Sequence, residues 1–177
     1  MPEEIEVPTE QLHETLHEKA HDGPGWFSQV ALSAAVFAVL AAIAALQAGH
    51  HANEAMLEQM QATDKWSLFQ AKSIKRSLVE TKIEILGALN KDVKEDDRKS
   101  IERYETEKKE VEEKAREQEH SAEEHMHRHV ILARSVTVFQ VAIALSAIGV
   151  LTRKKLVWFG SIAVGALGAF FLVQAFL

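Results

Sequence analysis

The chain has 177 residues, a formal net charge of −6, 47% hydrophobic residues and no cysteine. With only three prolines and eight glycines among many Ala, Leu, Val and Ile residues, a β-rich fold is disfavoured. The missing cysteines exclude disulfides and thiolate metal sites, and the acidic balance argues against a nucleic-acid partner. The sequence therefore predicts an all-α protein.

The first 25 residues differ in composition from the rest of the chain. Acidic residues surround a single Lys19, and His13, His17 and His21 share one face of a short amphipathic helix that Gly23-Pro24-Gly25 should end. A cleaved signal peptide would begin with a basic region, so this acidic start disfavours one. We expect residues 1–25 to form a short helix and a linker.

Three apolar stretches then predict membrane-spanning helices, since a bilayer core needs roughly 20 apolar residues. They are residues 26–48, 130–151 and 156–177, and only Arg134, near the start of the second, is charged. Its long side chain can reach the membrane interface. The second and third stretches are joined by the basic loop 152–155, which forces them into a tight pair.

This basic loop also predicts an orientation, because short loops rich in Lys and Arg stay on the cytoplasmic side. Arg153, Lys154 and Lys155 are then cytoplasmic, as is the N-terminus, and the segment between the first two spans is external. Trp26 and Trp158 fall at the same interface in this arrangement. We expect a multi-pass protein of the bacterial inner membrane.

Residues 49–129 are highly charged and predict a long antiparallel, coiled-coil-like helical hairpin. The turn should lie near residues 90–97, with Asp96 or Asp97 capping the returning helix. The returning arm continues in register into the second span, as one helix would. The outgoing arm has a weaker stripe, which we expect to form the seam: Leu57, Leu68, Ala71, Leu78, Ile85 and Leu89. So poor a seam is marginal alone, which predicts a homo-oligomer.

The outgoing arm contains the segment DKWSLFQAKSIK, from Asp64 to Lys75. It resembles a family of uncharacterised bacterial membrane proteins, the domain-of-unknown-function family numbered 4337. The resemblance implies three spans with a long helical insertion and carries no activity. Trp66 and Phe69, three residues apart, predict an aromatic anchor in the hairpin or a subunit interface, with docking of another protein of a membrane complex as the alternative.

Small residues in the spans predict close helix packing within the bilayer. In the first span they recur as Ala34, Ala38 and Ala42, and in the third as Ser161, Gly165 and Ala169. We expect each stripe to meet a neighbouring helix, and Gly165 to support association of copies in the membrane.

Nine histidines gather near the predicted membrane boundaries. An antiparallel hairpin brings two groups to similar depth, and together they form a candidate Zn or Cu site: His50, His51, Glu54, Glu124, His125, His127 and His129. Such spacings are also common in polar helices. Interfacial packing and a pH-responsive cluster therefore remain alternatives.

No nucleophile elbow, phosphate loop, HExxH or dinucleotide motif occurs in the chain, and we expect no enzymatic activity. The leading hypothesis is a self-associating scaffold or accessory subunit that presents a helical hairpin outside the bilayer. The alternative is a metal-binding, pH-sensing or ion-conducting oligomer that uses the juxtamembrane His, Glu and Met residues.

Overall fold

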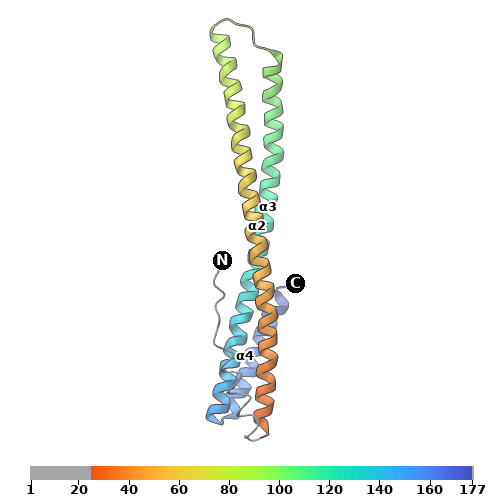
Figure 1. Cartoon of the computed structure of the whole chain (residues 1–177), viewed down its shortest axis with the longest axis vertical. Helices are drawn as coiled ribbons and strands as arrows, with labels where there is room; N and C mark the ends of the chain where they lie inside the picture. The colour runs from red at the N-terminus through yellow and green to blue at the C-terminus, as the bar shows by residue number, and fades with distance from the viewer. Residues whose placement is uncertain (1–24, 177) are drawn as a thin grey trace. The chain divides into compact units, whose positions relative to one another are not determined.

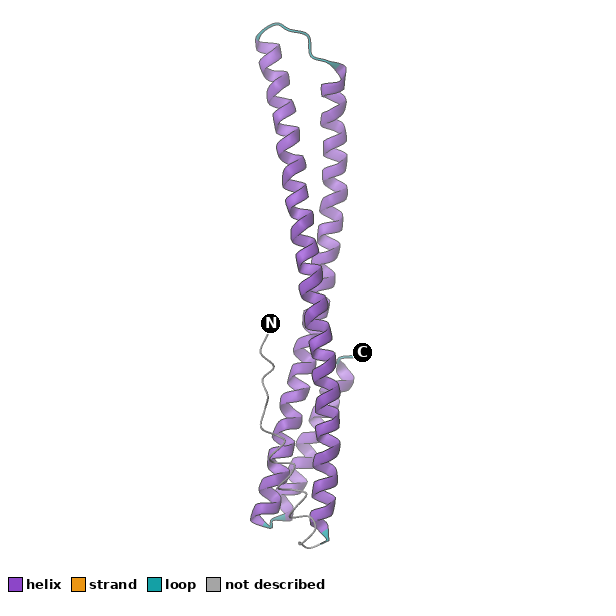
Figure 2. Cartoon of the chain, in the orientation of Figure 1, coloured by secondary structure: helices purple, strands orange, loops and turns teal. Residues whose placement is uncertain are grey.

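The structure is a computed structural model that describes residues 25–176. In this range the protein is all helical, with α2 at Trp26–Ala88, α3 at Glu95–Thr152 and α4 at Lys155–Gln174, and no strand is present (Figures 1 and 2). All three helices are long and apolar enough to cross a membrane, and the all-α prediction is confirmed. The predicted N-terminal helix and His13, His17 and His21 lie outside the described residues.

Each of the first two helices combines an apolar and a highly charged part. α2 is 63 residues long and α3 is 58, so neither is broken where its composition changes. The connection between them is shorter than we expected from sequence, since α3 already begins at Glu95. Asp96 and Asp97 therefore lie in its first turn rather than before it, and the capping prediction was wrong. In the first turn their charges still favour the positive end of the helix dipole.

Both long helices end in the same hydrogen-bonded motif. After α2, the amides of Asn90 and Lys91 donate to the carbonyls of Gly87 and Leu86, and Asn90 has a φ of 49°. After α3, Arg153 and Lys154 repeat the pattern, with a φ of 54° at Arg153. This is the Schellman motif, which satisfies the last carbonyls and turns the chain sharply. After α3, only the two residues Arg153 and Lys154 separate the helix from α4.

The described chain divides into two compact units, the first containing the residues up to His51 and from His127 onward, and the second containing Ala52–Met126. One end of the first unit is closed by an apolar cluster of Phe27, Val30, Ala34, Ala147 and Val150, with Trp26 and Trp158 packed against it. The two tryptophan rings lie 6.3 Å apart. This agrees with the expectation that both lie at the same level.

The centre of the first unit depends on two glycines of α4. The rings of Phe37 and Phe139 are stacked 6.2 Å apart. A Cβ at Gly165 would fall 2.3 Å from the Phe37 ring, and one at Gly168 would fall 2.9 Å from the Phe139 ring. The hydroxyl of Ser135 also donates to the Gly168 carbonyl at 2.9 Å. Only residues without a side chain fit at these two positions of α4.

The small-residue stripes differ from those we predicted. Ala34 is buried, but Ala38 is only half-buried and Ala42 is exposed. The buried alanines of α2 in this unit are instead Ala31, Ala34, Ala41, Ala44 and Ala48, and three of them, Ala34, Ala41 and Ala48, recur every seventh residue. On α4, Ser161, Gly165 and Gly168 are buried, whereas Ala169 is half-buried. Gly165 thus contacts a helix of its own chain.

In the second unit α2 and α3 lie side by side (Figure 1). Buried alanines lie on both helices: Ala55 and Ala62 of α2 and Ala115 and Ala122 of α3 are at most 5% exposed, and each pair is again seven residues apart. From Gln61 to Lys82 the polar partners on α3 run from Gln118 through Glu107 and Glu105 to Asp97. Trp66, which bonds Glu119, is the exception to this descending order. Alanine at a seven-residue spacing permits a close approach of the two backbones.

Our predicted seam on α2 was wrong. Leu57, Leu78 and Ile85 are 51%, 65% and 54% exposed, and Leu68 and Leu89 are exposed as well. Their face of α2 is opposite the one that carries Ala55, Ala62 and Phe69, since half a turn separates the two sets on a helix of 3.6 residues per turn. The second unit therefore buries its small residues and exposes its large apolar ones.

Substitution at Gly165 tests the packing of the first unit. Gly165→Ala should destabilise the helical fold in mild detergent by about 1–3 kcal/mol, because the added methyl group overlaps the Phe37 ring. Gly160→Ala is the matched control on α4, since nothing lies within 4 Å of its Cβ position. Unfolding by added SDS, followed by circular dichroism, measures the difference. Equal stability of the two variants would contradict this packing, and Phe37→Leu should restore Gly165→Ala.

Candidate functional site

The aromatic pair predicted as an anchor lies at the contact between α2 and α3. The indole nitrogen of Trp66 donates to Glu119 at 2.7 Å, and Arg116 lies 5.7 Å from the centre of the Trp66 ring. Phe69 packs edge-on against Trp66 at 5.4 Å, and the amino group of Lys108 lies 5.5 Å from the Phe69 ring. Both aromatics thus bind the arm of their own chain. Each ring is half-buried at this contact.

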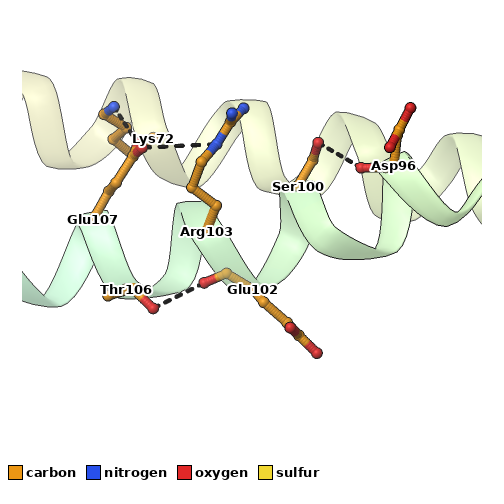
Figure 3. A network of polar contacts seen from close by, with 7 residues as sticks. All are labelled: Lys72, Asp96, Ser100, Glu102, Arg103, Thr106 and Glu107. Atoms are coloured by element: carbon orange, nitrogen blue, oxygen red, sulfur yellow. Dashed lines mark hydrogen bonds and ion pairs between the residues drawn. The ribbon is translucent and has the colours of Figure 1, made fainter.

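A row of ion pairs continues from the aromatic pair along the same contact. Lys72 pairs with Glu107, Arg76 with Glu105 at 3.1 Å and Lys82 with Asp97 at 2.7 Å. Figure 3 shows Glu107 between Lys72 of α2 and Arg103 of α3. Sequence reasoning missed these pairs. The signal was available for two of them, because Lys72 and Arg76 lie on the same face as Ala62 and Phe69.

These pairs lower the pKa of two carboxyl groups. The pKa of Glu107 lies below its ordinary value, first because Lys72 donates a hydrogen bond to its charged form and then because Lys72, Arg103 and Lys75 are positive. The pKa of Glu105 is lowered mainly by the hydrogen bond from Lys108, with Arg76 and Lys109 adding to it. A partly lost hydration of each carboxylate opposes the shift without reversing it. The folded arm therefore stabilises the charged carboxylates of Glu105 and Glu107 relative to their protonated forms.

The histidines assigned to the first unit are held at the helix surface. The rings of His50 and His51 lie 5.5 Å apart on α2. On α3, Nδ1 of His129 lies 2.9 Å from the Ala48 carbonyl oxygen, and His127 is exposed. Both a neutral and a protonated imidazole can donate this hydrogen bond. The contact between His129 and Ala48 therefore joins α3 to α2 in either protonation state. It connects the two helices at the end of the apolar region.

In the second unit the remaining members of the candidate metal site lie in carboxylate–imidazole contacts. Glu124 lies 3.5 Å from His120 on the same helix, and His125 lies 4.0 Å from Glu58 of α2, whereas Glu54 is half-buried. Among residues 25–176, no three His, Asp or Glu side chains are grouped so that they could hold a metal ion. The Zn or Cu hypothesis thus has no geometric support in the described chain.

One surface depression lies beside His129 and Arg134 in the first unit. Its volume is about 420 Å³, and it is lined almost entirely by apolar atoms of α3 and by Phe171 of α4. The depression is wide open, and Arg134 and His129 are its only side chains with ionisable groups. It is an open, apolar groove between helices rather than an enclosed substrate pocket.

Comparison with protein-family models identifies one family. The model described as "Domain of unknown function (DUF4337)" matches residues 26–177, which includes all three helices and both units. The chain belongs to this family. Comparison with curated proteins and with solved structures gives no match. Membership of DUF4337 confirms the resemblance inferred from the Trp66 segment, and assigns no activity.

The lowered carboxyl pKa values predict that the arm becomes less stable at low pH. A carboxyl group whose pKa is lowered by folding stabilises the folded state fully at pH values above its pKa in the unfolded chain, which is about 4.3 for glutamate. This stabilisation is lost as the pH falls through the lower pKa of the folded state. Protection of residues 70–110 against hydrogen exchange, corrected for intrinsic rates, should be constant from pH 7 to about 5 and should fall below about pH 4.

Glu107→Gln should reduce this protection at pH 7 and flatten its pH dependence, because the variant cannot carry the charge that Lys72 binds. Glu113→Gln is the control, since Glu113 is exposed on the same helix. Identical profiles for the two variants would mean that the ion pairs do not hold the arm together.

The alanine contact predicts intolerance of large residues. Ala122→Leu should destabilise the second unit by about 1–3 kcal/mol, because a leucine cannot fit where the side chain is 5% exposed against the neighbouring helix. The adjacent Glu123 is exposed, so Glu123→Leu should change the free energy of unfolding by less than about 0.5 kcal/mol. The free energy of local opening, measured by hydrogen exchange of residues 52–126, distinguishes them. Equal effects would rule out close packing at Ala122.

Proposed function

We propose that this protein is a non-enzymatic, self-associating scaffold or accessory subunit of the bacterial inner membrane. In this proposal three helices span the bilayer, and an antiparallel coiled-coil hairpin formed by the charged parts of α2 and α3 stands outside it. The observation that carries the proposal is the change of surface along α2 and α3. Each helix has one part with an apolar surface and another part whose surface mixes acidic and basic residues.

The side chains of the first unit support insertion into lipid. In the most apolar windows of α2, α3 and α4, only 28%, 44% and 17% of the residues are buried inside the protein. Large apolar side chains therefore point outward, among them Leu46 at 75% and Leu156 at 82% exposed. Water would make so large an apolar surface strongly unfavourable, whereas a bilayer accommodates it. Ser135, Ser146 and Ser161 have their hydroxyls bonded within the protein, as a lipid-embedded chain requires.

The cross-helix partners support the hairpin. Gln61 meets Gln118, Lys72 meets Glu107, Arg76 meets Glu105 and Lys82 meets Asp97, as residues of two antiparallel helices would. Only Trp66, whose long side chain reaches Glu119, departs from this order. Lysines and arginines of α2 meet carboxylates of α3, so the pairs select this partner and this direction. The isolated ion pairs add little energy each. Their role is to fix the register of a contact whose closeness is set by alanine.

The scaffold role follows from what the hairpin offers to other molecules. Its side chains form a structured surface, and the chain belongs to a family with no assigned activity. A stable helical rod connected to a membrane anchor is suited to binding proteins, including further copies of itself. The N-terminus is proposed to be cytoplasmic and the hairpin periplasmic, because Arg153, Lys154 and Lys155 form a short basic loop.

Labelling of single cysteines tests the membrane arrangement, and the absence of natural cysteines makes it clean. Asp92→Cys, in the connection between α2 and α3, should react with a membrane-impermeant maleimide in intact spheroplasts. Lys154→Cys, between α3 and α4, should react only after the membrane is opened. Both positions are exposed, so reactivity depends on the side of the membrane.

The reverse pattern would invert the proposed topology while keeping the three spans. Labelling of both positions in intact spheroplasts, or recovery of the protein in the soluble fraction, would refute the membrane scaffold. Native mass spectrometry of the wild-type protein in mild detergent should show an oligomer, and a monomer at every concentration would refute self-association.

A further inference from the structure

The large apolar side chains that the second unit exposes lie almost entirely along one helix. Along α2 they are Met56, Leu57, Met60, Leu68, Ile74, Leu78 and Ile85, with Leu89 directly after the helix, each 43–65% exposed. On the part of α3 in this unit, Met126 is the only large apolar side chain with comparable exposure among the described residues. The outward surface of α3 is instead rich in glutamate, lysine and arginine. The exposed apolar set of α2 lies opposite the face that contacts α3, and we refer to it as the outer face of α2.

The outer face has the spacing of a coiled-coil seam. Leu57, Ala71, Leu78 and Ile85 fit one position of a seven-residue repeat, and Met60, Ser67, Ile74, Thr81 and Ala88 fit the position three residues later. Such a pattern places its side chains between those of a parallel partner helix. The only charged residue in the pattern is Asp64. Since the inner face of α2 already contacts α3, the outer face is a second seam with no partner among residues 25–176.

We propose that the outer face of α2 is the self-association surface of this protein, and that its occupant is the same face of a second copy, parallel and in register. This deepens the proposed function and rests on it. In α2 the outer face is continuous with an apolar span, so two copies inserted in one membrane present it in the same direction. A helix pair of this kind is self-complementary, because each residue meets its own counterpart across a two-fold axis.

The extent of the outer face suits such a dimer. Its Leu, Ile and Met side chains are each 43–65% exposed and are distributed over residues 56–89, about nine turns of helix. Single exposed apolar residues need no explanation, but a row of them along a water-exposed arm marks a binding surface. A parallel copy in register would cover the whole row.

The residues beside the outer face are compatible with a parallel copy. In a parallel pair, flanking residues meet partner residues five positions further along the chain. Gln70 then faces Lys75 of the second copy, and Ser77 faces its Lys82, so no like charges are brought together along the flanks. Asp64 is the exception, because it meets itself in the seam. A single polar residue at such a position typically fixes the register and the number of helices at a cost in affinity.

Cysteine crosslinking in membranes containing the full-length protein tests the inference. Ile74→Cys should form a disulfide-linked dimer under mild oxidation, since its position faces its counterpart. Gln59→Cys on α2 and Glu110→Cys on α3 are the matched controls, because both are exposed and lie off the outer face. They should remain monomeric. Capture of another protein by Ile74→Cys in place of a second copy would overturn the proposed occupant.

Energy transfer between labelled copies in proteoliposomes gives a second measurement. Leu78→Glu combined with Ile85→Glu should raise the dissociation constant at least roughly tenfold, because two charges would be buried in each half of the seam. Asp64→Asn should lower the dissociation constant by removing the like-charge contact. The conservative Ile74→Cys decides the question if the double variant fails to fold.

The failures of the two proposals are distinguishable. A wild-type protein that is monomeric in liposomes at all concentrations overturns both self-association and the outer-face contact. An oligomeric wild type that does not crosslink through Ile74→Cys, and that keeps its affinity in the Leu78→Glu, Ile85→Glu variant, overturns only the outer face. Association would then depend on the membrane spans.

Discussion

Close approach of helices at positions without a large side chain is the constraint on which the rest of the structure depends. In the first unit Gly165 and Gly168 allow α4 to lie against the stacked rings of Phe37 and Phe139. In the second, alanines such as Ala62 and Ala122 occupy the contact between α2 and α3. Alanine and glycine gain little from the hydrophobic effect. They contribute contact area between backbones and between the side chains that flank them.

This constraint explains why composition predicts the elements better than their contacts. Charge-free stretches mark the spans, and the scarcity of Pro and Gly in the long arms predicts continuous helices. The same reasoning failed for the inner face of α2, because it took large apolar residues such as Leu57 and Leu78 as the core. Where two helices approach at alanine, a leucine does not fit and is excluded to the opposite face. The seven-residue spacing of Ala34, Ala41, Ala48, Ala55 and Ala62 was the available signal.

The candidate site was predicted unevenly for a related reason. Trp66 and Phe69 were identified because aromatics at helical spacing usually pack, but their partners Glu119 and Lys108 follow from the register of α3, which a sequence without an alignment does not fix. The histidines were grouped by their distance from the predicted membrane surface. Depth alone does not set the direction of a side chain around its helix. His129 points toward the Ala48 carbonyl, and Glu124 toward His120.

The two faces of α2 differ in chemistry, since the face toward α3 forms ion pairs and the opposite face is apolar. Lys72, Arg76 and Lys82 point toward α3 and select it as the intramolecular partner, while Leu78 and its neighbours are left outside. Because the outer surface of α3 is polar, only one apolar face remains for association. A contact in which one face meets its own copy is closed, since it leaves no free half to continue a chain of subunits. If the outer face is the self-association surface, as proposed, the charged arms associate in pairs rather than in an open polymer, and any larger assembly would need contacts made by the apolar parts of the helices.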